Sequence, residues 1–213
     1  MGKIKKGILG GFSGRVGTVI GGHWKGIAYM RSLPAQVSNP KTLPQKQQRA
    51  KFLLTLNFLK PLIEVIRVGW KLYANKQSQF NAALAYTVSN AITGDYPDYE
   101  IDPTKVLISR GALTSAVNPN VSAIGSNTVS VSWIDNSGIG TASPDDKALI
   151  AIINFSKNQV ASSICEALRS DAATTLMLPA DWIGENVDVY LGFVSDDRKQ
   201  IANSIYVGVV QVI

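Results

Sequence analysis

The chain has 213 residues, of which 46% are hydrophobic and 17% charged, so it holds enough apolar side chains for a packed core and is not a disordered protein. A single cysteine excludes a disulfide framework and any multi-cysteine metal site, and a single histidine excludes a site with two histidine ligands from one chain. The formal net charge at pH 7 is +6, a modest basic excess.

The first 26 residues are rich in glycine, with nine of the 18 glycines of the chain, which is typical of turns and short strands. The stretch from Arg15 to Ile20 is one predicted strand, Gly21-Gly22 is the predicted turn, and residues 24–31 form the returning strand. The glycines of residues 10–17 do not predict a phosphate-binding loop, because the Gly-Lys-Ser/Thr ending is missing and no helix follows. We therefore expect an N-terminal β-hairpin.

Helical periodicity begins after a connector with three prolines. Apolar residues recur at alternating spacings of three and four from Phe52 to Tyr73, which predicts a helix with one face towards a core. Pro61 removes a backbone donor within this stretch, so we expect a kink there or the start of a second helix. A third helix is predicted from about Lys76 to Ile92. The apolar face also fits a coiled-coil partner, but its shortness and Pro61 favour core packing.

From Thr93 onwards the sequence indicates short strands separated by turn clusters. The candidate strands are Val106–Arg110, Thr128–Ile134, Ala148–Phe155, Thr174–Leu178, Val187–Val194 and Ser204–Val212. Their number and spacing predict an antiparallel β-sandwich.

Three segments resemble those of immunoglobulin and fibronectin type III domains. Val129–Trp133 is similar to their strand B, Leu178–Trp182 to the end of strand E, and Val187–Tyr190 to strand F, with Tyr190 at the position of a tyrosine corner. The expected fold class is therefore α+β: a basic hairpin-plus-helical domain at residues 1–93 and an acidic immunoglobulin-like β-sandwich at residues 94–213. Such sandwiches have many functions, so the resemblance implies no activity.

Charge is distributed very unevenly along the chain. Residues 1–92 carry 14 Lys or Arg and a single acid, Glu64, a net charge of +13. Residues 93–213 carry seven Lys or Arg and 14 Asp or Glu, a net charge of −7. Such asymmetry indicates an anionic partner for the basic half. Two interpretations stay open: a nucleic acid or other polyanion, or contact between basic and acidic halves within one molecule or between copies.

Basic side chains interleaved with aromatic ones make residues 3–51 the candidate polyanion-binding segment. The basic candidates are Lys3, Lys5, Lys6, Arg15, Lys25, Arg31, Lys46, Arg49 and Lys51. Trp24 and Tyr29 alternate with basic residues and are the candidates for stacking on single-stranded bases. Since the sequence has no helix-turn-helix, zinc-finger or RNP signature, binding of this kind would be mostly electrostatic and salt-dependent.

No arrangement of residues indicates catalysis. His23 and Cys165 lie in different predicted halves, so they do not form a nucleophile–base pair, and Cys165 has the apolar neighbours of a semi-buried side chain. The acidic stretch from Asp95 to Asp102 lacks the EF-hand pattern and fits a solvated edge. We predict no catalytic, metal or cofactor residues and a protein that is not an enzyme, with a carboxylate-dependent hydrolase as an alternative.

Targeting signals are also missing from the sequence. The segment after Lys6 is too short and glycine-rich for the apolar region of a signal peptide, and no apolar run reaches membrane-spanning length. We expect a soluble protein that is made in the cytoplasm and has no membrane span.

Residues 2–21 resemble the opening of a family of uncharacterised proteins from Bacteroidota, and other segments extend the resemblance over the whole chain. These segments are Trp24–Ile27, Arg31–Pro34, Gln48–Phe52, Tyr99–Asp102, Val106–Gly111 and Asn203–Gly208. A family of unknown function implies no site residues, but it does imply a bacterial or phage and mobile-element setting.

The leading prediction is a non-enzymatic structural or interaction protein that self-associates as a homo-oligomer, such as a component of a phage particle, through contacts between basic and acidic halves. The first alternative is a nucleic-acid-binding protein that uses residues 3–51. The second is a carbohydrate- or protein-binding immunoglobulin-like module, in which a surface Trp182 would contact a sugar.

Overall fold

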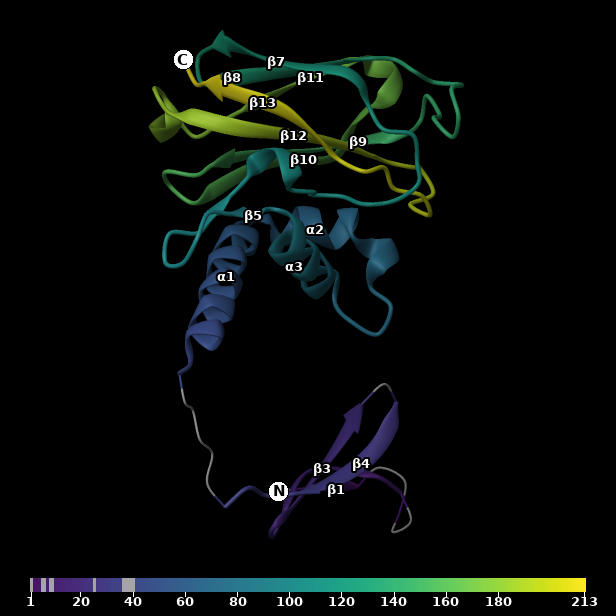
Figure 1. Ribbon diagram of the computed structural model, residues 1–213. Coiled ribbons are helices and arrows are strands. Elements are labelled where there is room, and N and C mark those ends of the chain that lie inside the picture. Colours follow the sequence, from purple (N-terminus) through teal and green to yellow (C-terminus); the bar gives the residue numbers. More distant parts are fainter. Residues whose placement is uncertain (1, 5–6, 8–9, 25, 36–40) are drawn as a thin grey trace. The chain divides into compact units, whose positions relative to one another are not determined.

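The computed structural model describes residues 2–4, 7, 10–24, 26–35 and 41–213 (Figure 1). The chain divides into two compact units, Met1–Thr42 and Leu43–Ile213, which we call unit 1 and unit 2. This division comes well before residue 93, where composition and pattern change, because the helices share a hydrophobic core with the C-terminal strands.

Unit 1 contains an antiparallel sheet with the strand order β1-β2-β3-β4. The strands are β1 (Lys3–Ile4), β2 (Phe12–Val16), β3 (Val19–Trp24) and β4 (Ile27–Ser32).

The prediction of a turn at Gly21-Gly22 is wrong, since both glycines lie inside β3 and the turn between β2 and β3 is at Gly17-Thr18. A Cβ atom on Gly21 would lie 2.3 Å from the carbonyl oxygen of Phe12. Gly21 therefore serves the close approach of two backbones and not a change of chain direction.

Helices open unit 2. They are α1 (Leu43–Leu59), α2 (Ile63–Gly69) and α3 (Gln79–Asn90), with the short 3₁₀ helices η1 (Lys60–Leu62) and η2 (Lys71–Tyr73). Pro61 lies in η1, so the predicted interruption between two helices is confirmed. Ile66 and Trp70 of the predicted apolar face are buried, whereas Phe52 on α1 has 47% of its surface exposed.

Three further sheets follow the helices. The four-stranded sheet has the order β10-β9-β12-β13, the three-stranded sheet the order β11-β8-β7, and β5 pairs with β6. Their strands are β5 (Ile92–Thr93), β6 (Glu100–Ile101), β7 (Val117–Gly125), β8 (Thr128–Ile134), β9 (Lys147–Asn154), β10 (Gln159–Leu168), β11 (Ala173–Met177), β12 (Asn186–Val194) and β13 (Ile205–Gln211).

Most predicted C-terminal strands are present, but one is not a strand, and the short β6 and the longer β7 and β10 were missed. Residues 106–110 are irregular although Val106 and Ile108 are buried. The two longer missed strands, β7 and β10, each contain a register shift against their partner strands, and in β10 the alternation of burial is broken. Cys165 in β10 has a positive φ of 63° at such a shift.

Unit 2 has two hydrophobic cores, one on each face of the four-stranded sheet. Ile150 and Ile152 of β9 pack with residues of the three-stranded sheet in the first core. Leu149 and Ile153 of the same strand pack with residues of the helices in the second. Figure 1 shows α1, α2 and α3 on one side of this sheet and β7, β8 and β11 on the other. The apolar run of β9 is thus explained by burial on both faces.

Two residues of the expected immunoglobulin-like pattern have different roles in the structure. Trp182 is completely buried in the first core and donates a hydrogen bond from Nε1 to Oε1 of Gln159 at 2.8 Å, so the idea of a surface Trp182 is wrong. The hydroxyl of Tyr190 donates to the carbonyl oxygen of Pro103, far upstream in the sequence, and does not form a tyrosine corner.

Candidate interaction surface

The structure separates the nine basic candidates into three groups. Three of them, Lys5, Lys6 and Lys25, lie outside the described residues. Unit 1 holds Lys3, Arg15 and Arg31, and helix α1 of unit 2 holds Lys46, Arg49 and Lys51.

Lysine 51 has a local partner within unit 2. The Nζ atom of Lys51 lies 4.8 Å from the centre of the Tyr99 ring, a cation–π contact that holds this side chain against its own unit. The candidate surface in unit 1 therefore does not include Lys51.

Strand register brings the candidate aromatic and basic residues of unit 1 to one face of its sheet. Residues directly opposite each other in an antiparallel pair project from the same face, and alternate residues along a strand do so too. Arg15 is paired with Ile20, and Ile20 with Arg31. Farther along β3, Gly22 is paired with Tyr29 and Trp24 with Ile27. We call this set the basic–aromatic face: Arg15, Ile20, Gly22, Trp24, Ile27, Tyr29 and Arg31.

The two rings of the basic–aromatic face are presented outwards. Trp24 has 63% of its surface exposed, and Tyr29 is exposed as well. A Cβ atom on Gly22 would lie 3.0 Å from the Tyr29 ring, so the missing side chain leaves room for this ring to lie against β3. Gly22 and Ile27 are not among the residues predicted from sequence, although Gly22, Trp24, Ile27, Tyr29 and Arg31 show the alternation that marks one face of a hairpin.

The electrostatics of this face are simple, because residues 1–42 contain seven Lys or Arg and no acid. Arg15 and Arg31 are both exposed, and Nε of Arg15 donates to the carbonyl oxygen of Gly17 at 3.0 Å. No carboxylate of unit 1 can neutralise either guanidinium. The face is suited to attract an anion.

The opposite face of the same sheet is mainly apolar. It carries Val16, Val19, Ala28 and Met30, with Phe12 against Gly21, and its polar residues are His23 and Ser32. Val16 is 54% exposed and Met30 is 70% exposed. We call these side chains the apolar face.

Among the described residues of unit 1 only Gly21 is buried, so the sheet has no core of its own. A sheet with one exposed apolar face is marginally stable in water until something covers it.

Strand β4 lies at the edge of the sheet, and all six of its residues are exposed. One side of β4 pairs with β3, and no other strand in the described part of the chain pairs with its second side. Lysine, proline or a bulge usually protects an edge strand from pairing with another chain. In β4, whose sequence is Ile-Ala-Tyr-Met-Arg-Ser, only Arg31 has this effect.

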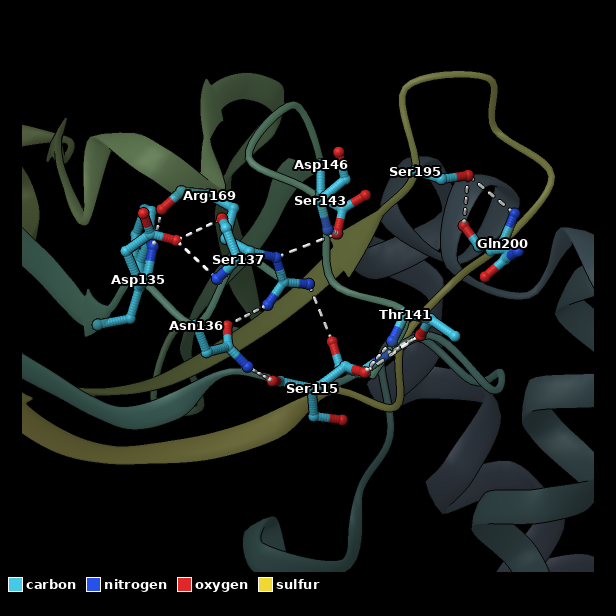
Figure 2. A network of polar contacts seen from close by, with 12 residues as sticks. Ser115, Asp135, Asn136, Ser137, Thr141, Ser143, Asp146, Arg169, Ser195 and Gln200 are labelled. Carbon is cyan, nitrogen blue, oxygen red and sulfur yellow. Dashed lines mark hydrogen bonds and ion pairs between the residues drawn. The ribbon is translucent and has the colours of Figure 1, made fainter. Parts of the chain in front are cut away.

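A buried polar network in unit 2 is the second cluster of chemically active groups (Figure 2). Arg169 donates from Nε to Asp146 at 3.0 Å, from Nη1 to Asn136 at 2.6 Å and from Nη2 to the carbonyl oxygen of Thr114 at 2.9 Å. Asn136 in turn donates to the carbonyl oxygen of Ser115. Burial lowers the pKa of Arg169, and the Asp146 carboxylate opposes this shift. The network joins the loops that carry Thr114, Asn136, Asp146 and Arg169.

The two residues considered for catalysis belong to different units. His23 is exposed on β3 in unit 1, and Cys165 is half-buried on β10 in unit 2, where burial raises the pKa of its thiol. Among the described residues no three His, Cys, Asp or Glu side chains form a group that could hold a metal ion. In the same part of the chain, no helix has the length and apolar character needed to span a membrane.

The comparisons with known proteins concern family and fold. The model of a family described as "Family of unknown function (DUF6266)" matches residues 11–208. No curated protein matches the chain. A solution structure of the fn3 domain of the human collagen alpha-1(XX) chain is similar, with 10% sequence identity, coverage of 49% of this chain and 89% of that chain, and a TM-score of 0.36.

Proposed function

The chain belongs to DUF6266, a family of unknown function whose matched region spans both units, and we propose that it is a non-enzymatic structural protein that self-associates through its N-terminal sheet. In this proposal unit 1 forms the contact between copies of the chain, and unit 2 is the folded domain joined to it. The observation that carries the proposal is a single-layered sheet whose apolar face and edge strand β4 are both exposed.

The burial of apolar side chains in the two units supports these different roles. Unit 2 has two cores in which residues such as Leu62, Ile66 and Ile150 have no exposed surface. Unit 1 instead leaves Val16 and Met30 largely exposed. Since burial of apolar surface contributes about 25 cal/mol per Å², a contact that covers these side chains stabilises both the complex and unit 1 itself.

Strand β4 can pair with β4 of a second copy about a two-fold axis perpendicular to the sheet. With Tyr29 on the axis, Arg31 stands opposite the partner's Ile27. With Met30 on the axis, Arg31 stands opposite the partner's Tyr29. Neither register places two arginines opposite each other, and the apolar faces of the two copies become continuous.

Contact between basic and acidic halves is the other route to self-association. Exposed or partly exposed acids of unit 2 already have local partners: Asp102 pairs with Lys105, and Asp181 with Lys157. Asp196 pairs with Lys147. These pairs leave less free negative charge than the count of acids suggests, which favours the route through β4.

For unit 2 we propose a single immunoglobulin-like sandwich whose C′-C-F-G sheet is also covered by helices. The orders β11-β8-β7 and β10-β9-β12-β13 correspond to strands E-B-A and C′-C-F-G of such a domain. The proposal gives unit 2 a rigid architecture and assigns it no activity of its own. A role in a phage particle stays a prediction.

Analytical ultracentrifugation of the full chain, from low to high protein concentration, tests self-association. We expect an oligomer that persists or becomes stronger in high salt, since screening reduces the repulsion between two basic units while apolar burial remains. Met30→Lys, which places a charge on the edge strand, should weaken the association at least about tenfold.

Met177→Lys is the matched control, because Met177 is 78% exposed on the edge strand β11 of unit 2 and the substitution adds the same charge. It should leave the association unchanged. A strict monomer under all conditions would overturn the proposal. Association that high salt abolishes and that Met30→Lys leaves intact would assign it to basic–acidic contact instead.

A further inference from the structure

We infer that the basic–aromatic face of unit 1 binds single-stranded nucleic acid, with Trp24 and Tyr29 stacking on bases and Arg15 and Arg31 contacting phosphates. This inference rests on the face opposite the apolar one, and it stands whether or not the protein self-associates.

The stacking surface follows from the register of β3 and β4. Tyr29 is opposite Gly22, and Trp24 is two residues farther along β3, so the two rings are diagonal neighbours, with Cα atoms about 7–8 Å apart. Each exposed ring offers a flat apolar surface of the kind on which unpaired bases stack. Because Gly22 has no side chain, Tyr29 lies against the sheet.

The phosphate contacts follow from the next row of the sheet. Arg15 and Arg31 flank Ile20 on its two sides, so their Cα atoms are about two strand spacings, roughly 10 Å, apart. Both guanidinium groups are exposed on the face that carries the rings. Arginine offers several N–H donors in a planar group that suits phosphate oxygens.

The residue types of the basic–aromatic face indicate which class of ligand it binds. An acidic protein surface would satisfy Arg15 and Arg31 but would not need two exposed rings beside them. A duplex would satisfy the charges but would keep its bases stacked and away from Trp24 and Tyr29. A flat sheet with aromatic side chains is a common solution for unpaired bases. Single-stranded nucleic acid uses both features at once.

Tryptophan fluorescence of the full chain is a direct probe, because Trp24 is exposed whereas Trp70, Trp133 and Trp182 are buried. Titration with oligothymidylate in low salt should quench the emission of Trp24 and shield it from a soluble quencher. The emission of the three buried tryptophans should not change.

Fluorescence anisotropy of a labelled oligothymidylate gives the affinity of each variant. Tyr29→Ala should weaken binding about fivefold to a hundredfold, the range of one base–aromatic stack. Arg15→Gln with Arg31→Gln should weaken binding and lower the slope of log K against log salt by about 1.4, at about 0.7 per phosphate contact on a single strand. Arg15→Lys with Arg31→Lys retains the charges and should restore most of the salt slope.

The matched control is Lys60→Gln with Lys71→Gln, which removes the same charge from exposed positions of unit 2 and should leave the slope unchanged. Circular dichroism verifies that each variant is folded. The inference is overturned if the chain does not bind oligothymidylate in low salt, or if the face variants bind like the unmodified chain. Equal binding of a duplex or of polyglutamate, with no effect of Tyr29→Ala, would also overturn it by showing a purely electrostatic surface.

The outcome is separable from that of the self-association experiment. Met30 lies on the apolar face, so Met30→Lys should disrupt the oligomer and still bind oligothymidylate. Weaker nucleic-acid binding in Arg15→Gln, on β2 and away from the β4 edge, together with an intact oligomer would support both proposals independently.

Discussion

The guanidinium of Arg169 meets the carboxylate of Asp146 at 3.0 Å, at a place where neither side chain has more than 2% of its surface exposed. Arg169 also lies over the ring of Phe193, at 3.8 Å from its centre. The ion pair thus joins the loop before β9, the 3₁₀ turn after β10 and the core strand β12. Its charges are compensated only while every partner is present.

Removal of one partner should therefore be costly. Asp146→Asn leaves the buried guanidinium without its counter-charge and should reduce the free energy of unfolding of unit 2 by about 3–5 kcal/mol. Urea denaturation followed by circular dichroism measures the change. Lys157→Gln is the control, because it breaks a more exposed ion pair with Asp181 and should cost less than about 1 kcal/mol. Equal effects of the two substitutions would contradict the structural role of the network.

We expect the stability of the folded chain to depend on pH through Asp188. This half-buried carboxylate on β12 accepts a hydrogen bond from the hydroxyl of Tyr206 at 2.7 Å. Burial raises its pKa above the ordinary value of 3.8, partly offset by that hydrogen bond. The folded chain therefore keeps this proton where the unfolded chain has lost it, so the contribution of Asp188 to stability falls as pH rises from 3.8 through the raised pKa.

Asp188→Asn should consequently be more stable than the unmodified chain at neutral pH, and the difference should shrink in acid. Thermal denaturation across the acid range measures it. Asp98→Asn, at an exposed position, is the control and should change stability by a few tenths of a kcal/mol at most. A variant that is less stable at neutral pH than in acid, relative to the unmodified chain, would refute the assignment.

Gly21 should be the most sensitive position of unit 1. An added Cβ atom would collide with the backbone of Phe12, which cannot move without distorting β2. Gly21→Ala should destabilise the sheet by about 1–3 kcal/mol and leave unit 2 unaffected. Hydrogen exchange read by mass spectrometry should show faster exchange in β3 and β4. Thr18→Ala, at an exposed turn position, should exchange normally.

The sequence predicts much of the secondary structure, but it does not predict the structural role of Gly21 and Gly22. Thr128–Ile134 is recovered because its alternation of side chains is uninterrupted. Gly21-Gly22 is misread because local pattern cannot separate a turn glycine from one that permits a close contact. β10 is missed because its alternation of burial is broken, and β7 because Asn118-Pro119-Asn120 has low strand propensity.

The candidate surface is predicted in part. The sequence identifies Trp24, Tyr29, Arg15 and Arg31, since basic and aromatic residues alternate there. It does not separate them from Lys51, which contacts Tyr99 in unit 2, because composition carries no information about which unit a helix packs on. The apolar face is not foreseen either, as Met30 and Val16 have the sequence character of ordinary core residues.

The helices pack on the four-stranded sheet through a shared core. Ile66 on α2 has no exposed surface and shares a core with Leu149 and Tyr190 of the four-stranded sheet. Ile66→Ala should lower the free energy of unfolding by about 2–5 kcal/mol.

Because helices and strands share this core, the loss should appear in a single transition that includes the strands. Chemical denaturation monitored in parallel by helical circular dichroism and by the emission of the buried Trp133 measures it. Leu53→Ala on α1, where the side chain is 58% exposed, is the control and should have little effect. If the helical signal were lost first while Trp133 kept its native emission, the helices would be a separate domain. The boundary near residue 93, which composition indicates, would then be the correct one.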